Sequence, residues 1–226
     1  MMPADEPRTL VRVWDLPTRA FHWTLVVLIA LQYGTGEFHM LDMRWHFWFG
    51  YATLALILFR VLWGLVGSQT SRFVEFVRGP RAVARYLSAQ LSTSPQISIG
   101  HNPLGGWSVL LLMMAIAAQV VSGLFASDEI DTDGPLVPFV SMRTVKWMTR
   151  VHDWNQNLLI ALIALHVVAA LLYLLLKREN LIVPLISGRK SLSEGTALRF
   201  ASGWLALALL LVCCAVVGVF VWWTGA

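Results

Sequence analysis

The 226-residue chain has few charged residues and almost no cysteine. Charged side chains make up 13% of the sequence, about half of the ~25% that is usual in soluble domains. Together with a mean hydropathy of +0.65, this excludes an ordinary soluble protein and indicates a polytopic membrane protein. The two cysteines, Cys213 and Cys214, are adjacent, which excludes a disulfide framework, a four-cysteine zinc site and an iron–sulfur cluster.

Five long apolar runs are present instead, and each is close to the ~20 residues that cross a bilayer as a helix. They lie at residues 21–38, 46–66, 107–125, 152–176 and 201–223. Glycine, proline and charged residues occupy the gaps between them. Asp15 and Pro17 mark the expected start of the first helix. The sequence therefore predicts an all-α, polytopic membrane helix bundle, with a four-helix core and a fifth, C-terminal transmembrane helix.

Lysine and arginine predict the orientation, because they accumulate in the cytoplasmic loops of membrane proteins. If the N-terminus is inside, only Arg44, Arg143, Lys146 and Arg150 of the 17 basic residues lie outside. We therefore expect a cytoplasmic N-terminus and, after five spans, a periplasmic C-terminus.

Two loops have the composition of contact surfaces. The inner loop at residues 67–106 interleaves arginines with aromatic and aliphatic residues, which favours an amphipathic helix on membrane lipid. A solvated basic loop is the alternative. The acidic loop at residues 128–133, which is expected outside, favours a cationic partner, although most charge runs are merely solvated surface. No nucleic-acid partner is expected.

Four histidines lie in or beside the apolar runs at depths that match in pairs. His152 and His166 are 14 residues apart in one run, so they leave the same helix face, about 21 Å apart along its axis. In the expected orientation His46 and His152 are near the outer surface, and His22 and His166 are near the inner surface. Because polar side chains inside a membrane need partners, we predict one histidine pair at each depth.

Each pair suits haem iron better than a bare metal ion. Zinc and copper sites need three or four converging ligands, whereas two axial histidines complete a haem whose porphyrin supplies the other four. Six-coordinate iron has no vacant position for dioxygen, which favours electron transfer. The predicted cofactors are two haems, one held by His46 and His152 and the other by His22 and His166.

Basic residues near the pairs are candidates for contacts with the haem propionates. Arg44 and Arg150 lie on the outer side, and Arg19 lies on the inner side. Basic residues also flank membrane helices simply because they set the orientation of the protein in the membrane. These arginines therefore have that alternative explanation beside contact with the propionates.

Other small or polar positions have candidate roles. Gly34, Gly50 and Gly123 are small enough to let a macrocycle lie against a helix. His101, in the segment Gly-His-Asn-Pro at the inner surface, is either part of a helix-start turn or a group that hydrogen-bonds quinone or transfers protons near the inner haem. His39 is expected to be a surface residue.

Several short motifs occur in order along residues 10–180. They are Asp15-Leu-Pro-Thr-Arg-Ala-Phe-His22-Trp23, His46-x-x-x-Gly50, Phe59-Arg60-Val-Leu-Trp63-Gly64-Leu-Val-Gly67, Gly100-His-Asn-Pro-Leu-Gly105, and His152 with His166. In this order they resemble bacterial cytochrome b561 and the b-type cytochrome subunit of nickel–iron hydrogenases. The Arg60-x-x-Trp63 and Gly-His-Asn-Pro segments are most similar to the hydrogenase-type branch.

The resemblance implies a bundle of at least four helices with two stacked b haems. Such proteins pass electrons between a redox partner at one membrane face and the quinone pool. The resemblance assigns the ligand role to His22, His46, His152 and His166. We expect residues 1–180 to form the dihaem cytochrome b domain, and residues 181–226 to form an inner loop and the fifth helix.

Three functions are compatible with these features. The leading prediction is electron transfer across a bacterial cytoplasmic membrane, between an outer c-type cytochrome or hydrogenase-like subunit and ubiquinone or menaquinone. The first alternative is a superoxide:quinone oxidoreductase, although an acidic outer loop disfavours an anionic substrate. The second is a membrane anchor whose haems are mainly structural. Whether the chain is an enzyme by itself depends on which of these holds.

Overall fold

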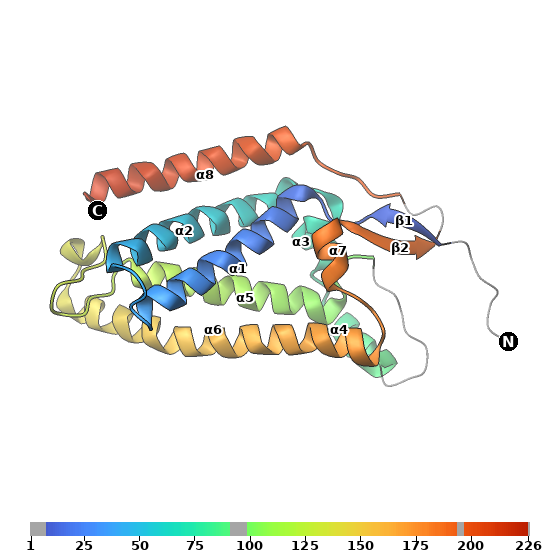
Figure 1. Ribbon diagram of the computed structural model, residues 1–226, viewed down its shortest axis with the longest axis horizontal. Helices are drawn as coiled ribbons and strands as arrows, with labels where there is room; N and C mark the ends of the chain where they lie inside the picture. The colour runs from blue at the N-terminus through green and yellow to red at the C-terminus, as the bar shows by residue number, and fades with distance from the viewer. Residues whose placement is uncertain (1–7, 91–98, 194–196, 226) are drawn as a thin grey trace. The chain divides into compact units, whose positions relative to one another are not determined.

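The computed structural model describes residues 8–90, 99–193 and 197–225, which are mostly helical (Figure 1). Part of the predicted amphipathic inner loop, residues 91–98, lies outside the described residues. The elements are β1 (Arg8–Arg12), α1 (Leu16–Gly36), α2 (Met43–Val66), η1 (Gln69–Ser71), α3 (Phe73–Phe76), α4 (Pro80–Gln90), α5 (Pro103–Gly123), η2 (Val137–Phe139), α6 (Met142–Leu176), α7 (Ile182–Ser187), β2 (Arg189–Ser193) and α8 (Gly203–Thr224).

Four of the helices in the described ranges, α2, α5, α6 and α8, are long and apolar enough to cross a membrane. This confirms the prediction of a helical membrane protein. The first predicted span is also helical, as the 21-residue α1. It is less apolar than the other four because Arg19, His22 and Gln32 interrupt it. Its crossing of the membrane therefore stays a prediction.

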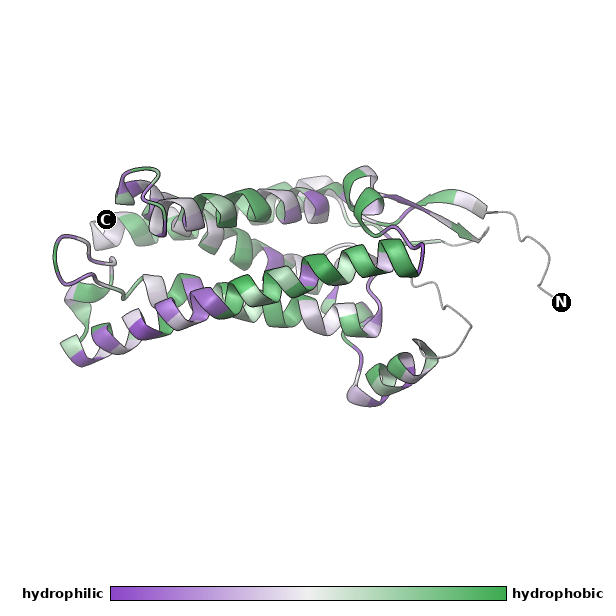
Figure 2. Cartoon of the chain, turned by 60° about the horizontal axis from the view of Figure 1, so that its bottom comes forward, coloured by the Kyte–Doolittle hydropathy of each residue, from purple (hydrophilic) through white to green (hydrophobic). Residues whose placement is uncertain are grey.

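Helix α6 is longer than the apolar run that predicted it. Its 35 residues extend about 50 Å at 1.5 Å per residue, well beyond a ~30 Å hydrocarbon core. The helix begins at Met142, because residues such as Arg143 and Lys146 are good helix formers although they are polar. Figure 2 shows the change along α6 from hydrophilic residues in its first half to hydrophobic residues in its second half.

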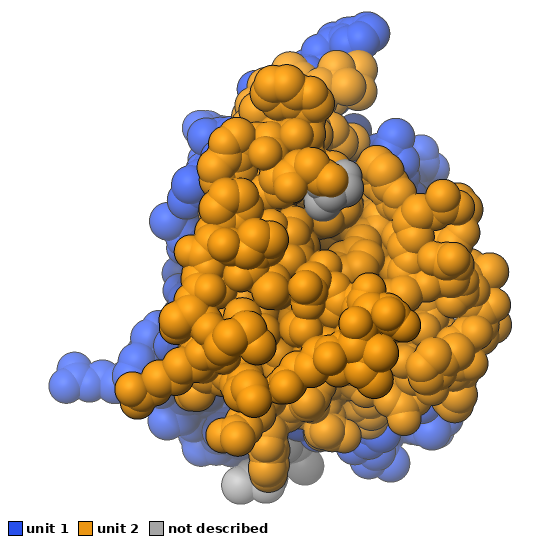
Figure 3. Space-filling model, turned by 90° about the vertical axis from the view of Figure 1, so that its left-hand side faces the viewer, with its two compact units in different colours: residues 1–20, 62–110, 165–206 blue, residues 21–61, 111–164, 207–226 orange. Residues whose placement is uncertain are grey.

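The chain divides into two compact units, which Figure 3 distinguishes by colour. Unit 1 contains residues 1–20, 62–110 and 165–206, and unit 2 contains residues 21–61, 111–164 and 207–226.

A two-stranded antiparallel sheet is a feature of unit 1 that the sequence did not predict. β1 pairs with β2 so that Arg8 lies opposite Ser193 and Arg12 lies opposite Arg189. Gly188 precedes β2 with a φ of +80°. Its carbonyl accepts hydrogen bonds from the backbone N–H groups of Val13 and Trp14, at 2.8 and 3.1 Å. Only glycine adopts this conformation without strain, so Gly188 fixes the turn that brings the strands together.

Asp15 joins the start of α1 to the end of α2 within unit 1. Its Oδ1 accepts a hydrogen bond from the backbone N–H of Thr18 at 2.8 Å, which caps the helix. Its Oδ2 accepts one from Nε1 of Trp63 at 3.1 Å. Asp15 and Trp63 are only 1% and 0% exposed. The predicted helix start is confirmed, and the motif residue Trp63 has a structural role as the partner of this buried carboxylate.

The predicted amphipathic segment contains helix α4 of unit 1. Tyr86 on α4 is buried, and its hydroxyl lies 2.7 Å from the hydroxyl of Tyr173 on α6. Arg81 and Arg85 on the same helix are exposed. The helix thus presents Tyr86 to the protein and its arginines to the surroundings, whereas Leu87 is exposed; contact of the helix with membrane lipid stays a prediction.

Helix α8 packs on α2 in unit 2. Tyr51 and Ala55 of α2 form a buried cluster with Val217 and Val221 of α8. Many other large apolar side chains of α8 are exposed, including Trp222 at 81%. An apolar helix that keeps an exposed apolar face is expected where lipid takes the place of water.

Candidate functional site

Two of the four predicted histidines lie together in unit 2. His46 is in the first turns of α2 and His152 is in the first half of α6, and the centroids of their rings are 6.4 Å apart. The ring planes are inclined by 74°, and both side chains are half-buried. The structure therefore brings together the pair that the sequence assigned to one depth.

The Nδ1 atom of His46 faces the C-terminal end of α1. It lies 3.1 Å from the carbonyl oxygen of Gln32 and 3.1 Å from Oγ1 of Thr35. A carbonyl oxygen only accepts hydrogen bonds, so Nδ1 carries the ring hydrogen in this arrangement. The lone pair is then on Nε2, which is the tautomer that binds a metal through Nε2.

His152 has a matching environment at the C-terminal end of α5. Its Nδ1 is 2.9 Å from the carbonyl oxygen of Gln119 and 3.3 Å from Oγ of Ser122. The same reasoning leaves the lone pair on Nε2. Both rings of the pair are thus held by one carbonyl and one hydroxyl from the end of the preceding long helix, α1 for His46 and α5 for His152.

These supporting residues were missed in the sequence. Their signal is a repeated five-residue pattern, Gln32-Tyr-Gly-Thr35-Gly36 at the end of α1 and Gln119-Val-Val-Ser122-Gly123 at the end of α5. Each copy is followed by the helix that carries one histidine of the pair. Hydroxyl residues are common in membrane helices as partners of their own backbone, so one copy alone has little meaning, whereas the repetition is informative.

The glycine that closes each pattern lies against the supported ring. A Cβ on Gly36 would be 3.2 Å from Cε1 of His46, and one on Gly123 would be 2.9 Å from Cε1 of His152. Gly123 was predicted to leave room for a macrocycle against its helix, but the group that lies against it is the imidazole ring of His152. The other two predicted positions differ, because a Cβ on Gly34 would meet Met40 and one on Gly50 would meet only Gln32.

The separation of the two rings is close to that expected for two histidines that bind one haem iron from opposite sides. A metal–nitrogen bond of about 2 Å on each side, with about 1 Å more to each ring centre, separates two axial imidazole centroids by about 6 Å, close to the observed 6.4 Å. A small cavity of about 80 Å³, lined by His46, Gln119, Leu159 and other residues of α1, α2, α5 and α6, adjoins the pair. Within the described residues no group of three or more His, Cys, Asp or Glu side chains is suited to a bare ion.

The other two predicted ligands lie on helices α1 and α6. His22 is in the second turn of α1 and its ring is 5.0 Å from that of Trp23. His166 is on α6, one half of the helix beyond His152. Both side chains are half-buried. His22 belongs to unit 2 and His166 to unit 1, and their pairing stays a prediction.

The predicted arginines differ in their surroundings. Arg44 and Arg150 are exposed, at the start of α2 and on α6 respectively. Arg19 is half-buried in unit 1, where its Nη1 donates a hydrogen bond to the carbonyl oxygen of Ile186. Their contact with propionates stays a prediction, and for Arg19 the bond to Ile186 is a structural role already in place.

His101 lies in an aromatic environment in unit 1. Its ring centroid is 4.8 Å from that of Trp14 and 4.6 Å from that of Phe76. The neighbouring Asn102 caps α5, because its Oδ1 accepts a hydrogen bond from the N–H of Gly105 at 2.7 Å, while its Nδ2 donates to the hydroxyl of Tyr173. The Gly-His-Asn-Pro segment therefore does start a helix, and the residue that caps this helix is Asn102. His39 is exposed as expected.

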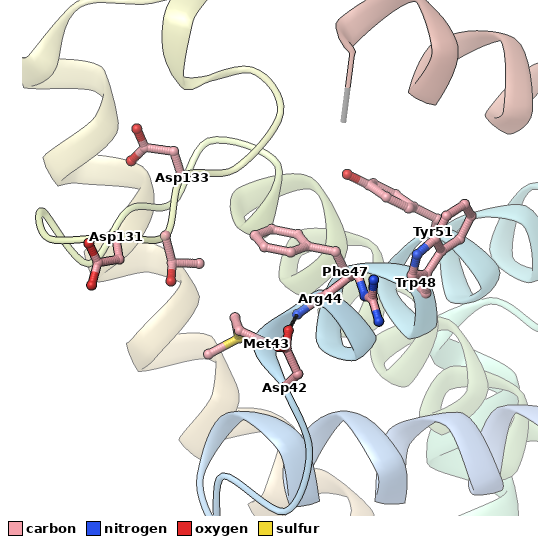
Figure 4. A pocket seen from close by; sticks show the side chains of 9 residues that line it. Asp42, Met43, Arg44, Phe47, Trp48, Tyr51, Asp131 and Asp133 are labelled. Carbon is pink, nitrogen blue, oxygen red and sulfur yellow. Dashed lines mark hydrogen bonds between the residues drawn. The ribbon is translucent and has the colours of Figure 1, made fainter.

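An open groove of about 360 Å³ lies beside the start of α2 in unit 2 (Figure 4). Asp42 and Arg44 line one side, and Asp131 and Asp133 of the acidic loop line the other, with Phe47 between them. Three carboxylates against one guanidinium make the groove acidic.

The acidic loop itself is ordered around Asp128. Its Oδ1 accepts hydrogen bonds from the backbone N–H groups of Thr132, Ile130 and Asp131, at 2.9, 2.9 and 3.1 Å. These bonds, with that from Thr132 the largest influence, lower the pKa of Asp128 because they stabilise the charged carboxylate. Glu129 forms a 3.4 Å ion pair with Lys146 on α6.

Comparisons with known proteins give one family and a small set of relatives. Residues 13–188 match the family described as prokaryotic cytochrome b561. The chain is 24% identical to the probable Ni/Fe-hydrogenase B-type cytochrome subunit of Bradyrhizobium diazoefficiens, an alignment that covers 83% of this chain and 88% of the relative. It is 22% identical to the probable Ni/Fe-hydrogenase 1 B-type cytochrome subunit of Escherichia coli K12, over 79% and 90% of the two chains. No solved structure matches the chain significantly.

Proposed function

The chain belongs to the prokaryotic cytochrome b561 family, and from this premise we propose that it transfers electrons between a redox partner at the outer membrane face and the quinone pool. Family membership makes it a membrane-bound b-type cytochrome of electron transport, with haem b as cofactor. Bound haem would supply reversible one-electron chemistry. The residues of the chain position the cofactor, control its surroundings and provide the surfaces at which partners bind.

The observation that carries the proposal is the His46–His152 pair. Two imidazoles from different helices lie at the separation that two axial ligands of one metal require. Both have Nδ1 tied to a carbonyl oxygen, so both direct an unprotonated Nε2 away from the supporting helices. We assign one haem b to this pair, near the outer surface, and a second to His22 and His166, near the inner surface.

The proposed outer partner is a hydrogenase-like subunit or a c-type cytochrome with a basic docking face. The relatives are named as cytochrome subunits of nickel–iron hydrogenases. In this chain the acidic groove formed by Asp42, Asp131 and Asp133 is in the same unit as the His46–His152 pair. Opposite charge would speed encounter with a basic partner. The proposed orientation in the bacterial cytoplasmic membrane has the N-terminus in the cytoplasm and the C-terminus in the periplasm.

The proposed quinone region lies on the inner side. His101, between Trp14 and Phe76, offers a ring that can donate a hydrogen bond to a quinone carbonyl. We propose residues 1–180 as the dihaem domain and residues 181–226 as an inner segment followed by α8.

Haem content of the purified full chain tests the ligand assignment. We expect two haem b groups per chain, and we expect His46→Ala and His152→Ala each to remove the same single haem. His22→Ala and His166→Ala should each remove the other. His39→Asn is the matched control, because His39 is exposed, has a φ of +49° that asparagine tolerates, and should retain both haems. Two haems that persist in the His46→Ala and His152→Ala variants would refute the assignment.

The same variants separate electron transfer from a purely structural role. If the chain carries electrons to quinone, His22→Ala should stop reduction of quinone by the partner while the His46-dependent haem is still reduced. Quinone reduction that continues at the original rate in this variant would instead support a membrane anchor with mainly structural haems.

A further inference from the structure

The repeated pattern at the ends of α1 and α5 has a function that the ligand assignment alone does not include. We propose that Thr35 and Ser122 are positioning residues, which fix the ring orientation of His46 and His152 and tune the electron donation of their Nε2 atoms. This inference depends on the proposed function in one respect, that the His46–His152 pair binds haem.

The hydroxyl groups are oriented as acceptors toward the rings. Oγ1 of Thr35 donates its single hydrogen to its own helix, where the carbonyl oxygens of Leu31 and Gln32 are 2.8 and 3.0 Å away. Oγ of Ser122 is likewise 2.6 and 3.1 Å from the carbonyl oxygens of Ala118 and Gln119. With the hydrogen used in this way, the oxygen lone pairs remain for the Nδ1–H group of the histidine.

The Nδ1–H group of each ring therefore has two acceptors, a backbone carbonyl and a hydroxyl. Two neighbouring acceptors that share one N–H, such as Oγ1 of Thr35 and the carbonyl oxygen of Gln32, which are 3.0 Å apart, restrict rotation of the imidazole about its bond to Cβ more than one acceptor does. The ring orientation in turn determines where Nε2 points. The hydroxyls thereby hold the donor atom of each histidine in place before a cofactor is bound.

Burial strengthens the electrostatic effect of these bonds. Thr35 is 2% exposed and Ser122 is 1% exposed, so water does not compete for the Nδ1–H group. In such surroundings a hydrogen bond polarises its donor more strongly than in water. An acceptor at Nδ1–H makes Nε2 a stronger electron donor, which stabilises ferric iron over ferrous iron. Removing a hydroxyl should therefore raise the reduction potential of the haem that the pair holds.

The two hydroxyls should differ in strength. For His46 the hydroxyl is as close to Nδ1 as the carbonyl is, at 3.1 Å each. For His152 the carbonyl is closer, at 2.9 Å, and the hydroxyl is at 3.3 Å. Loss of the Thr35 hydroxyl should consequently shift the potential more than loss of the Ser122 hydroxyl.

The experiment measures the midpoint potential and the low-spin ferric EPR signal of each haem in the purified full chain. The haem of interest is the one lost in His46→Ala. Thr35→Val removes the hydroxyl at nearly constant volume, Thr35→Ser keeps it, and Ser122→Ala tests the second site. Thr224→Val is the matched control, because Thr224 makes the same two bonds within its own helix, to the carbonyl oxygens of Phe220 and Val221.

We expect Thr35→Val to retain both haems and to raise the ferrous-to-ferric ratio of the His46-dependent haem at a fixed potential several-fold. A tenfold change corresponds to about 59 mV for a one-electron couple. The EPR signal of this haem should move as well, because it reports the ring orientation. Ser122→Ala should give a smaller shift in the same direction. Thr35→Ser should resemble the unmodified protein, and Thr224→Val should leave both haems unchanged.

Unchanged potential and EPR signal in Thr35→Val, with both haems retained, would overturn the inference. If Thr35→Val loses the haem, normal values in Thr35→Ser with a raised potential in Ser122→Ala support the inference. Altered values in Thr35→Ser equal to those of Thr35→Val would overturn it, because the hydroxyl would then be irrelevant. Retention of both haems in His46→Ala and His152→Ala is a different result, and it would refute the ligand assignment itself.

Discussion

The ends of α1 and α5 support His46 and His152 with the same three groups, a carbonyl, a hydroxyl and a glycine. The distances from these groups to the two rings differ. At the end of α1, hydroxyl and carbonyl are equally close to the Nδ1 of His46, and the glycine leaves 3.2 Å for the ring. At the end of α5, the carbonyl of Gln119 is the closest acceptor to His152 and the glycine leaves only 2.9 Å. The difference predicts that side-chain hydrogen bonding matters more for His46 and that steric clearance matters more for His152.

A second polar contact extends this contrast. On the α5 side, Nδ2 of Asn155 donates to Oε1 of Gln119 at 2.7 Å and to the carbonyl oxygen of Ala115 at 2.8 Å. On the α1 side, Nε2 of Gln32 donates to Oγ1 of Thr53 at 3.1 Å. The glutamine is thus an acceptor in one copy and a donor in the other, and α6 is linked to α5 by shorter bonds than α2 is to α1.

The largest effect is expected from filling the glycine positions. Alanine at position 123 would bring Cβ within 2.9 Å of Cε1 of His152, a distance that forces the ring or the helix to move. We expect Gly123→Ala to lose most of the haem that depends on His152 and to destabilise the protein by about 1–3 kcal/mol. Gly36→Ala, with 3.2 Å available, should retain more haem. Haem per chain and the thermal midpoint in detergent measure both effects.

Gly218→Ala is the control for this prediction, because nothing lies within 4 Å of a Cβ at Gly218. Equal haem retention in Gly123→Ala and Gly36→Ala would show that clearance does not distinguish the two ends.

An intermediate effect is expected from the second polar contacts. Asn155→Ala leaves Oε1 of Gln119 without its 2.7 Å donor in a buried position, and we expect a loss of about 1–2 kcal/mol in the free energy of unfolding. Thr53→Ala removes one longer bond between helices, from Gln32, together with a bond to the carbonyl oxygen of Phe49 in its own helix, and the lost bond between helices should cost about 0.6 kcal/mol. Thermal or denaturant unfolding in detergent measures the two losses. A larger loss of stability in Thr53→Ala than in Asn155→Ala would contradict this prediction, because the α1–α2 contact would then stabilise the protein more than the α5–α6 contact.

The smallest effect concerns the loops that follow α1 and α5. Asp128 accepts three backbone N–H bonds, whereas Asp42 accepts one, from Arg44. The lowered pKa of Asp128 means that its stabilisation of the loop is fully present above the unfolded pKa of about 3.9 and is lost as the pH falls through the folded pKa.

We therefore expect amide exchange in residues 128–134 to accelerate below about pH 4, after correction for intrinsic rates, more than exchange in residues 37–42. Asp128→Asn keeps an acceptor oxygen without a titration in this range, so its loop should lack the acid response. The same acid response in Asp128→Asn would assign it to another group.

The sequence predicted the fold where hydrophobicity alone decides the structure. Each of the five apolar runs contains most of one long helix, because a membrane core requires about 20 apolar residues and internal backbone hydrogen bonds. It failed where polar residues continue a helix, as at the start of α6. It also failed for the β1–β2 sheet, because two short, polar strands far apart in sequence give no local signal.

The candidate site was predicted in part for a similar physical reason. Depth along the helices was enough to pair His46 with His152, because it follows from helix rise and orientation. It was not enough to identify Thr35 and Ser122, whose role depends on which face of α1 meets α2 and which face of α5 meets α6. The contacts of Gly36 and Gly123 with the rings depend on the same packing.

The pairing of β1 with β2 also orders events during synthesis. β1 emerges from the ribosome first, but its partner strand ends at Ser193, after α2, α5 and α6 have all been made. β1 therefore has no partner strand until β2 has been made, and the sheet closes only after α2, α5 and α6 have been synthesised. A nascent chain arrested before Arg189 cannot form this sheet, so formation of the sheet reports that synthesis has passed α6 and α7.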